Sequence, residues 1–254
     1  MTDRQNFEQA VIFAGGRGER LRPLTDTLPK PMAPVHGRPF SDYLIRALAA
    51  AGIRRVLILV GYKAEKFMDY YADGAEFGIN IDYSLGQEDD QTGRRLLNAF
   101  SKLEDRFLLL YGDNYWPVPL TGMAANYARL GRPVTTTVFS NRHGTGEYGY
   151  ENNVVVSPDW TVKAYDKSRK APGLNGVDIG FFLVDKRVLD PRETGNISFE
   201  ESILSQLAAQ GRLGAFLTEE QYYYITSLES LSRFEQVVVQ KGFSPMERKT
   251  QHGS

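Results

Sequence analysis

The stretch AVIFAGGRGERLRPLTDTLPKP, residues 10–31, joins a short apolar run to a segment rich in glycine and basic residues. The run Ala10–Phe13 is typical of a buried strand. Three glycines follow it: Gly15, Gly16 and Gly18. Their backbone can adopt angles closed to other residues and let amide N–H groups approach an anion. Four cations share the segment, Arg17, Arg20, Arg22 and Lys30. The stretch therefore predicts that the first strand of an α/β sheet ends at a polyphosphate site.

The spacing of the glycines separates this site from plain turns and from other phosphate loops. Glycines after a first strand are common in α/β proteins as simple punctuation. No Gly-Lys-Ser/Thr follows, as a P-loop would need, and the offsets differ from G-x-G-x-x-G. The longer string G-G-x-G-x-R-L-x-P-L-T, followed by P-K-P, resembles the amino-terminal signature of the sugar-1-phosphate nucleotidyltransferases, the nucleotide-sugar pyrophosphorylases. A match of this length seldom arises by chance.

The composition favours a soluble enzyme. A chain of 254 residues with 42% hydrophobic content can bury a substantial core. The net charge of −1 gives no basic field for nucleic-acid binding, so the cations of the glycine run act locally. The absence of cysteine excludes disulfides, thiol nucleophiles and cysteine-ligated metals. We expect a cytoplasmic location without a membrane partner, because neither a secretory signal nor an apolar run of ~20 residues is found.

The order of apolar and amphipathic segments predicts the fold. In the first part of the chain, strands are expected at 10–13, 56–60, 79–83 and 107–111, and helices at 40–51, 63–71 and 96–103. The run Val56–Val60 is apolar at consecutive positions, as in a parallel strand buried on both faces. We expect an α/β fold with a Rossmann-like mixed, mainly parallel sheet flanked by helices. Ligands of such a fold lie at the carboxyl ends of the strands.

After Trp116 the pattern changes, because Pro117 and Pro119 interrupt regular structure. Strands are expected at 134–139, 153–156, 161–165 and 177–184, and helices at 199–209 and 227–240. Neither an internal repeat nor a low-complexity linker is present. We predict a single domain, residues 1–254, of the nucleotide-diphospho-sugar transferase type that the resemblance implies. It would have a nucleotide-binding half at 1–116, a sugar-phosphate-binding half at 117–246 and a flexible tail at 247–254.

Asp113 is the candidate metal ligand. It follows the buried run FLLLYG, so its carboxylate is expected at the mouth of the sheet near the glycine run. A hard oxygen ligand there could hold Mg²⁺ against a triphosphate, although a turn aspartate bonded to its own backbone is about as common. In the family that the chain resembles, the aspartate of a G-D motif ending a buried strand binds the metal. Gly112-Asp113 matches that motif, which makes Mg²⁺ the expected cofactor.

Shorter matches follow in the family's order. The resemblance implies a nucleotide-binding set of Ala14, Gly15, Gly16, Arg17, Gly18, Gln87, Thr92, Gly93 and Gly112. Gln91-Thr92-Gly93 matches a loop of the L-G-T-G-G type that contacts the base, but Arg94 replaces a glycine. The resemblance also implies a sugar-phosphate-binding set of Tyr148, Gly149, Asp166, Lys167 and Asp178. Turn residues and a solvated Asp-Lys pair are the ordinary alternatives.

One departure from the family concerns the metal. Many members supply a second carboxylate from a D-I-G-T-P-E string, where this chain reads YITSLE from Tyr224. Tyrosine is a poor magnesium ligand at neutral pH, because its phenol has a pKa of about 10. Either Asp113 holds the metal with water and phosphate oxygens, or another carboxylate substitutes. The candidates are Glu219, Glu220 and Asp178.

The implied reaction is nucleotidyl transfer between two anions. A sugar 1-phosphate would attack the α-phosphorus of a nucleoside triphosphate, expel pyrophosphate and form a nucleotide-activated sugar. Cations must screen this approach, so Arg20 is assigned to the charge that develops around the α-phosphate and leaving group, and Lys30 to the α-phosphate or sugar phosphate. The acceptor oxygen is already ionised at pH 7, so no general base is needed.

The sequence between Tyr150 and Gly180, and the later GNISFE, are most similar to the D-glycero-D-manno-heptose 1-phosphate guanylyltransferase branch. This favours GTP and the heptose phosphate, for polysaccharide biosynthesis. Enzymes that act on N-acetylmuramate 1-phosphate or mannose 1-phosphate are the alternatives, and a non-sugar acceptor such as a pterin or an amino alcohol is less favoured. The missing second aspartate also leaves open a non-catalytic nucleotide-sugar sensor or regulatory subunit. No nucleic-acid partner is expected, and a homo-oligomer is left open.

Overall fold

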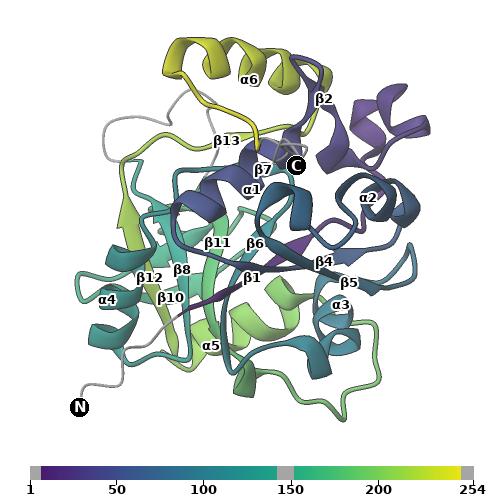
Figure 1. Cartoon of the computed structure of the whole chain (residues 1–254). Coiled ribbons are helices and arrows are strands. Elements are labelled where there is room, and N and C mark those ends of the chain that lie inside the picture. Colours follow the sequence, from purple (N-terminus) through teal and green to yellow (C-terminus); the bar gives the residue numbers. More distant parts are fainter. Residues whose placement is uncertain (1–6, 142–151, 247–254) are drawn as a thin grey trace. The chain divides into compact units, whose positions relative to one another are not determined.

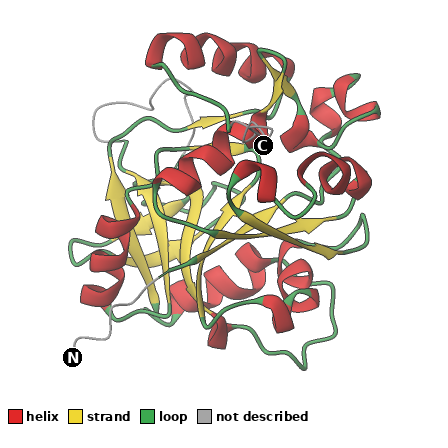
Figure 2. Cartoon of the chain, viewed as in Figure 1, coloured by secondary structure: helices red, strands yellow, loops and turns green. Residues whose placement is uncertain are grey.

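The computed structural model describes residues 7–141 and 152–246 (Figure 1). These residues form two compact units. Unit 1 comprises the described residues of Met1–Phe7, Asp90–Leu110 and Pro119–Tyr222. Unit 2 comprises those of Glu8–Asp89, Tyr111–Val118 and Tyr223–Ser254. The central sheet has nine strands and is flanked by helices, which confirms the expected α/β class (Figure 2).

Unit 2 contributes parallel strands to this sheet, as the sequence predicted. They are β1 (Gln9–Phe13), β4 (Arg55–Val60) and β5 (Asn80–Leu85), paired in the order β5-β4-β1. Every residue of β4 after Arg55 is buried, as expected for a parallel strand covered on both faces. The connections run through α1 (Phe40–Ala50) and α2 (Ala64–Tyr71). The chain thus forms successive β-α-β units.

The rest of unit 2 consists of short turns, two small sheets and one helix. The 3₁₀ turns are η1 (Glu19–Leu21), η2 (Leu24–Asp26), η3 (Lys30–Met32) and η4 (Ala75–Phe77). β2 (Pro34–Val35) pairs with β3 (Arg38–Pro39), and β7 (Asn114–Tyr115) pairs with β13 (Tyr223–Tyr224). The helix α6 (Leu228–Lys241) begins at Ser227, whose hydroxyl accepts the N–H of Ser230. This cap fixes the start of the helix.

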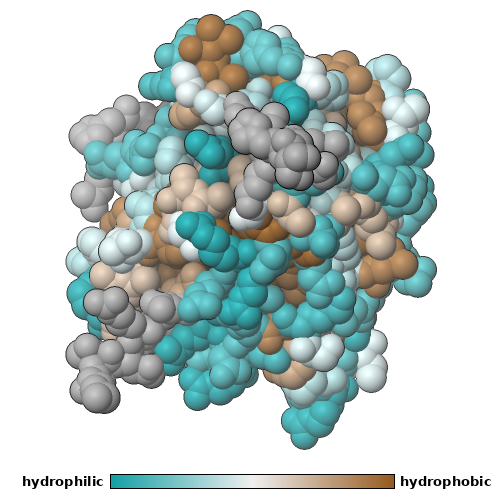
Figure 3. Space-filling model, in the orientation of Figure 1, coloured by the Kyte–Doolittle hydropathy of each residue, from teal (hydrophilic) through white to brown (hydrophobic). Residues whose placement is uncertain are grey.

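An aromatic cluster attaches α6 to its neighbours. The ring of Phe234 lies 4.9 Å from that of Phe40 and 5.3 Å from that of Tyr115, measured between ring centres. These contacts join α6 to α1 and β7, which holds the chain around β7 in place. On the outer face of α6, Leu228 and Val239 are exposed, and Figure 3 shows apolar surface over this helix.

Unit 1 carries the mixed part of the sheet. Its strands are β6 (Arg106–Tyr111, ending in unit 2), β8 (Val134–Phe139), β9 (Val154–Val156), β10 (Thr161–Tyr165), β11 (Val177–Asp185) and β12 (Leu213–Thr218). They pair in the order β6-β11-β8-β12-β10-β9. Only β10 and β11 run against their neighbours, so β6, β8, β9 and β12 share one direction. This agrees with the expected mixed, mainly parallel sheet.

The helices of unit 1 differ in detail from the prediction. They are α3 (Thr92–Asn98), η5 (Phe100–Lys102), α4 (Leu120–Leu130), η6 (Lys186–Val188), the π-helix η7 (Phe199–Leu204) and α5 (Ser205–Ala209). α3 starts four residues before the expected helix at 96–103 and gives way to η5. The sequence reasoning missed α4, because Pro119 was read only as a breaker; it lies immediately before the helix, where proline is tolerated.

Within the described ranges, no helix combines the length and apolar character that a membrane crossing requires. The predicted tail at 247–254 lies outside the described residues. The division into halves at residue 116 stays a prediction.

Candidate functional site

The glycine run forms the loop that leaves β1 in unit 2. Hydrogen bonds hold this loop from one side. The carbonyl of Gly15 accepts the N–H of Tyr62 at 3.1 Å, and the Tyr62 hydroxyl donates to the carbonyl of Thr25 at 2.8 Å. The hydroxyl of Thr25 in turn donates to the carbonyl of Gly18 at 3.0 Å. Gly16 is exposed, and a Cβ on it would meet no atom within 4 Å. The loop is thus fixed in shape while its Gly16 segment stays open.

Two glycines allow the parts of this site to approach closely. Gly18 has a φ of +63°, and a Cβ on it would lie 2.7 Å from the Cβ of Lys30. A Cβ on Gly112 would lie 2.7 Å from the carbonyl oxygen of Phe13. The N–H of Gly112 donates to that same oxygen at 2.9 Å. The chain before Asp113 therefore packs directly against the end of β1, where the glycine run begins.

Lys30 and Asp113 form an ion pair at this point. The Lys30 Nζ donates to Oδ2 of Asp113, and the side chains are 15% and 24% exposed. An ammonium has three donors and a carboxylate has two acceptor oxygens, so each group can take a further partner. The two predicted residues, which are 83 positions apart in the sequence, are brought together as one charged pair.

The arginines of the run differ in their partners. Arg17 pairs with Glu88 at 2.6 Å, and Arg22 pairs with Asp26 at 3.3 Å, with all four side chains about half exposed. Ion pairs at such exposure contribute little to stability and can be exchanged for a ligand. Arg20 is exposed, and within the described part of the chain its guanidinium forms neither a hydrogen bond nor an ion pair. Arg20 therefore keeps its whole set of donors for an anion.

The residues around Asp113 fit a magnesium ion that arrives with a triphosphate. Tyr224 pairs with Asn114 between β13 and β7, and the N–H of Ile225 donates to the carbonyl of Asp113 at 3.0 Å. The segment aligned with the family's second metal carboxylate thus does lie beside Asp113, but it brings a phenol. Among the described residues, no three acidic, histidine or cysteine side chains converge on one point. Magnesium is commonly held by one or two carboxylates together with phosphate oxygens and water, so Asp113 alone is a sufficient protein ligand.

In unit 1, Asp178 lies at the centre of a polar cluster. Its Oδ1 accepts from the hydroxyl of Thr136 at 2.7 Å and from the N–H of Gly180 at 2.9 Å, and its Oδ2 accepts from the hydroxyl of Tyr165 at 2.6 Å. Burial raises the pKa of Asp178 above its usual range. Burial, together with the charge of Asp178, raises the pKa of Tyr165 well above 10. The carboxylate thus already holds three protein donors and retains little capacity for a sugar hydroxyl.

Asp166 organises the turn that follows β10. Its Oδ1 accepts from the N–H and hydroxyl of Ser168 at 2.9 and 2.6 Å. Its Oδ2 accepts from the N–H groups of Lys170 and Ala171 at 2.8 and 2.7 Å. These hydrogen bonds, with the Ser168 side chain first, hold the pKa of Asp166 well below its ordinary value. The turn presents Lys167 as an exposed ammonium.

The remaining predicted residues lie in different settings. Gln87 is exposed in the chain after β5, while Thr92 and Gly93 begin α3. Tyr148 and Gly149 lie outside the described residues. The sequence reasoning missed Tyr165 and the buried Glu200, which accepts from the Thr92 hydroxyl at 2.6 Å. An acidic residue inside the apolar start of a predicted helix, as in ISFEES, was the available signal for Glu200.

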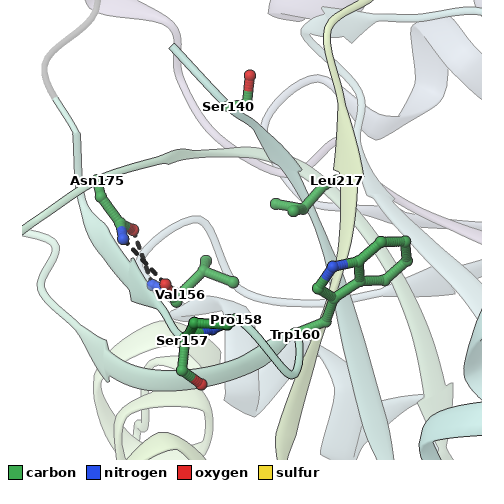
Figure 4. Close-up of a pocket in the computed structure, with 7 residues that line it drawn as sticks. All are labelled: Ser140, Val156, Ser157, Pro158, Trp160, Asn175 and Leu217. Carbon is green, nitrogen blue, oxygen red and sulfur yellow. Dashed lines mark hydrogen bonds between the residues drawn. The ribbon is translucent and has the colours of Figure 1, made fainter. Parts of the chain in front are cut away.

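Unit 1 also contains a cavity of about 390 Å³ (Figure 4). It is lined by Ser140, Val156, Ser157, Pro158, Trp160, Asn175 and Leu217. The amide of Asn175 is engaged by the backbone of Val156, whose N–H donates to it at 2.8 Å and whose carbonyl accepts from it at 2.9 Å. The guanidinium of Arg129 lies 4.7 Å from the ring centre of Trp160. None of the residues predicted for the site lines this cavity.

Comparison with known protein sequences gives consistent results. The family model described as nucleotidyl transferase matches residues 9–221. The D-glycero-alpha-D-manno-heptose 1-phosphate guanylyltransferase of Campylobacter jejuni is 30% identical over 195 residues, which cover 76% of this chain and 83% of the relative. The enzyme of the same name from Aneurinibacillus thermoaerophilus is 30% identical over 219 residues, which cover 83% of this chain and 90% of that relative. The mannose-1-phosphate guanylyltransferase of Mycobacterium tuberculosis is 28% identical over 203 residues, covering 80% and 56%.

Solved structures share the fold. The crystal structure of HddC from Yersinia pseudotuberculosis superposes with a TM-score of 0.75 at 21% identity, covering 91% of this chain and 99% of that one. A structure of HddC complexed with GMP-PN gives a TM-score of 0.73 over the same shares. At this identity the likeness supports the architecture, and it does not extend to the ligands.

Proposed function

Because the chain belongs to the nucleotidyl transferase family and is a sugar-1-phosphate nucleotidyltransferase of nucleotide-sugar synthesis, we propose that it transfers the guanylyl group of GTP to D-glycero-D-manno-heptose 1-phosphate. The products would be the GDP-sugar and pyrophosphate. The choice of substrates is supported by the two relatives at 30% identity that carry this name. Mannose 1-phosphate with GTP is the second candidate, since a relative of that name is 28% identical.

The observation that carries the proposed chemistry is the Lys30–Asp113 pair beside the glycine loop of unit 2. The loop offers backbone N–H groups to the triphosphate, and Lys30 and Arg20 supply positive charge. The proposed nucleotide contacts are those of Ala14, Gly15, Gly16, Arg17, Gly18, Gln87, Thr92, Gly93 and Gly112. In this assignment Arg17 would exchange Glu88 for a phosphate, and Arg20 would bind without giving up a partner.

Asp113 is the proposed ligand of Mg²⁺, which when bound would neutralise phosphate charge. The ammonium of Lys30 can then turn from Asp113 to the α-phosphate or the sugar phosphate. Arg20 would stabilise the charge that develops as pyrophosphate leaves. Catalysis would rest on positioning and preorganised charge, because the attacking phosphate oxygen is already ionised at pH 7.

The proposed acceptor contacts lie in unit 1. Lys167 is exposed on the turn that Asp166 organises, and its charge suits the sugar phosphate. Asp166 and Asp178, together with Tyr148 and Gly149, are proposed to face the sugar. The hydrogen bonds of both acids favour a role in holding the acceptor surface in shape. Asp166 already accepts four protein hydrogen bonds, whereas Asp178 accepts three and would offer its remaining acceptor position to a sugar hydroxyl.

The test is pyrophosphate release from a matrix of nucleoside triphosphates and sugar 1-phosphates, with and without Mg²⁺. The acceptors are the heptose, mannose, glucose and N-acetylmuramate 1-phosphates. We expect Mg²⁺-dependent release to be fastest with GTP and the heptose phosphate. Faster release with another pair would reassign the substrates. Binding of nucleotide sugars without pyrophosphate release from any pair would instead favour the sensor.

A further inference from the structure

The segment from Glu193 to Glu200 holds the start of α3 at several points within unit 1. The N–H of Gln91 donates to the Asn196 side chain at 2.7 Å, and the N–H of Arg94 donates to the carbonyl of Ile197 at 3.0 Å. These partners lie about 100 residues apart in the sequence. Two side chains provide further hydrogen bonds between the segment and α3, and we call these contacts the two fastenings. Glu200 forms the buried fastening and Arg94 the one near the surface.

Glu200 is the buried fastening. The residue is 5% exposed. Its carboxylate accepts hydrogen bonds from the hydroxyls of Thr92 and Ser198, each at 2.6 Å. The Thr92 hydroxyl accepts the N–H of Phe199 at 2.9 Å. The only proton of that hydroxyl is thus committed to Glu200, so the Thr92 side chain cannot donate to a bound base. Its hydroxyl holds the loop in position.

Arg94 is the outer fastening. Its Nε donates to the carbonyl of Gly195 at 2.8 Å, and its Nη2 donates to the carbonyls of Glu193 and Gly195, the former at 2.8 Å. A guanidinium presents its donors in a planar fork, which suits two carbonyls of one tight turn. The N–H of Gly195 also donates to Oε1 of Glu193 at 2.6 Å, which closes the turn that Arg94 grips.

Gly93 lies between the two fastenings and has no room for a side chain. A Cβ on it would lie 2.8 Å from both the carbonyl oxygen and Cγ1 of Ile197. The start of α3 therefore rests directly on the backbone of the 193–200 segment. A shift of this segment would move Thr92 and Gly93 with it.

We infer that Arg94 and Glu200 are positioning residues that strengthen nucleotide binding by fixing the Gln91–Gly93 loop on the 193–200 segment. The inference rests on the proposed function, in which Thr92 and Gly93 face the nucleotide. The guanidinium of Arg94 bonds the carbonyls of Glu193 and Gly195 directly, which ties the start of α3 to that turn. The loop then meets the nucleotide in one conformation, and less of the binding free energy is lost in ordering it.

The experiment compares Arg94→Ala with Arg94→Lys and with the control Arg192→Ala in the full-length protein. Arg192 is a matched control, because its side chain is 87% exposed and pairs with its neighbour Asp190. Steady-state kinetics are measured for each substrate, together with the melting temperature. We expect Arg94→Ala to raise KM for GTP about 10-fold, as loosening of a positioned loop does, and to leave KM for the sugar phosphate within about 2-fold. Arg94→Lys restores part of the loss, and Arg192→Ala matches the parent.

The buried fastening is tested by Thr92→Val against Thr92→Ser, which keeps the hydroxyl that Glu200 accepts. We expect KM for GTP to rise more in the valine variant than in the serine variant, because only valine removes the hydroxyl that donates to Glu200. Partial unfolding would lower kcat through loss of active protein and leave KM unchanged, so KM separates positioning from mere stability. If Arg94→Ala does not fold, the lysine and serine comparisons carry the test.

Two results would contradict the positioning role of Arg94 and Glu200, and both are distinct from a failure of the proposed function. The first is an unchanged KM for GTP in folded Arg94→Ala and Thr92→Val while the parent protein is active. The second is an equal increase in KM for GTP and in KM for the sugar phosphate, because a loop that positions only the nucleotide would not affect the acceptor. If the parent protein itself releases no pyrophosphate, the proposed function fails. The affinity for GTP, measured by calorimetry on the same variants, then tests the positioning role of Arg94 and Glu200.

Discussion

The glycine loop of unit 2 and the polar clusters of unit 1 are both rich in charge, but their charges have different partners. In unit 2, Arg20 has no described partner, and Arg17 pairs at the surface. In unit 1, Asp178 and Glu200 are already bonded to hydroxyls of their own unit. Exposed charges of the first kind can change partners at little cost, whereas satisfied carboxylates of the second kind hold a shape. We therefore expect substitutions in the first region to affect turnover, and those in the second to affect stability and KM.

The largest effect is expected for Asp113→Asn. An amide keeps the size of the side chain but removes the charge that would hold the metal and pair with Lys30. We expect kcat to fall at least ~100-fold, the scale of one lost preorganised charge contact, and the melting temperature to fall as well, because the 15% exposed Lys30 side chain loses its anionic partner. Asp26→Asn is the control, since Asp26 is exposed and pairs with Arg22 alone. Turnover within a few-fold of the parent, in folded protein, would refute the role of Asp113.

Arg20→Ala tests the cation without a partner. Since no described contact of Arg20 is lost, stability should stay constant while kcat falls about 100-fold. Arg22→Ala provides the comparison, because Arg22 lies in the same loop and pairs with Asp26. Similar losses in both variants would mean that the loop contributes only a diffuse field, and the comparison between the two regions would then lose its basis.

Gly112→Ala tests the close approach of Gly112 to the end of β1, which places Asp113 beside Lys30. The new Cβ would lie 2.7 Å from the carbonyl oxygen of Phe13, a backbone atom that cannot turn aside. We expect the free energy of unfolding to fall by about 1–3 kcal/mol, as is typical of overpacking. Urea denaturation measures this change, with Gly16→Ala as control because a Cβ at Gly16 meets no atom within 4 Å. Equal stability of the two variants would show that β1 can move away from Gly112.

The contrast between the regions also explains what the sequence could reveal. The apolar runs 56–60 and 107–111 predicted buried strands, because a strand needs only consecutive apolar residues. Gly112-Asp113 could be placed near the glycine run because both follow runs that the sequence predicts to be parallel strands, whose ends meet at one edge. The bonds of Arg94 to Glu193 and Gly195 leave no such trace, because their partners are backbone carbonyls about 100 residues away. Backbone carbonyls carry no residue identity that a pattern can show.

The smallest effect concerns pH and separates the two acids of unit 1. The pKa of Asp166 is lower in the folded protein than its ordinary value of 3.8, so its bonds stabilise the fold above that pH and are lost as pH falls toward the folded pKa. The pKa of Asp178 is raised, so its ionisation costs stability as pH rises through and above 3.8. We expect the destabilisation caused by Asp166→Asn to shrink as pH falls from 7 to 3.5. Stability of the parent relative to Asp178→Asn should instead increase over the same range. Urea midpoints at pH 7, 5 and 3.5 give both differences, and parallel trends for the two variants would contradict the assignment of Asp166 to its own turn and of Asp178 to a buried cluster.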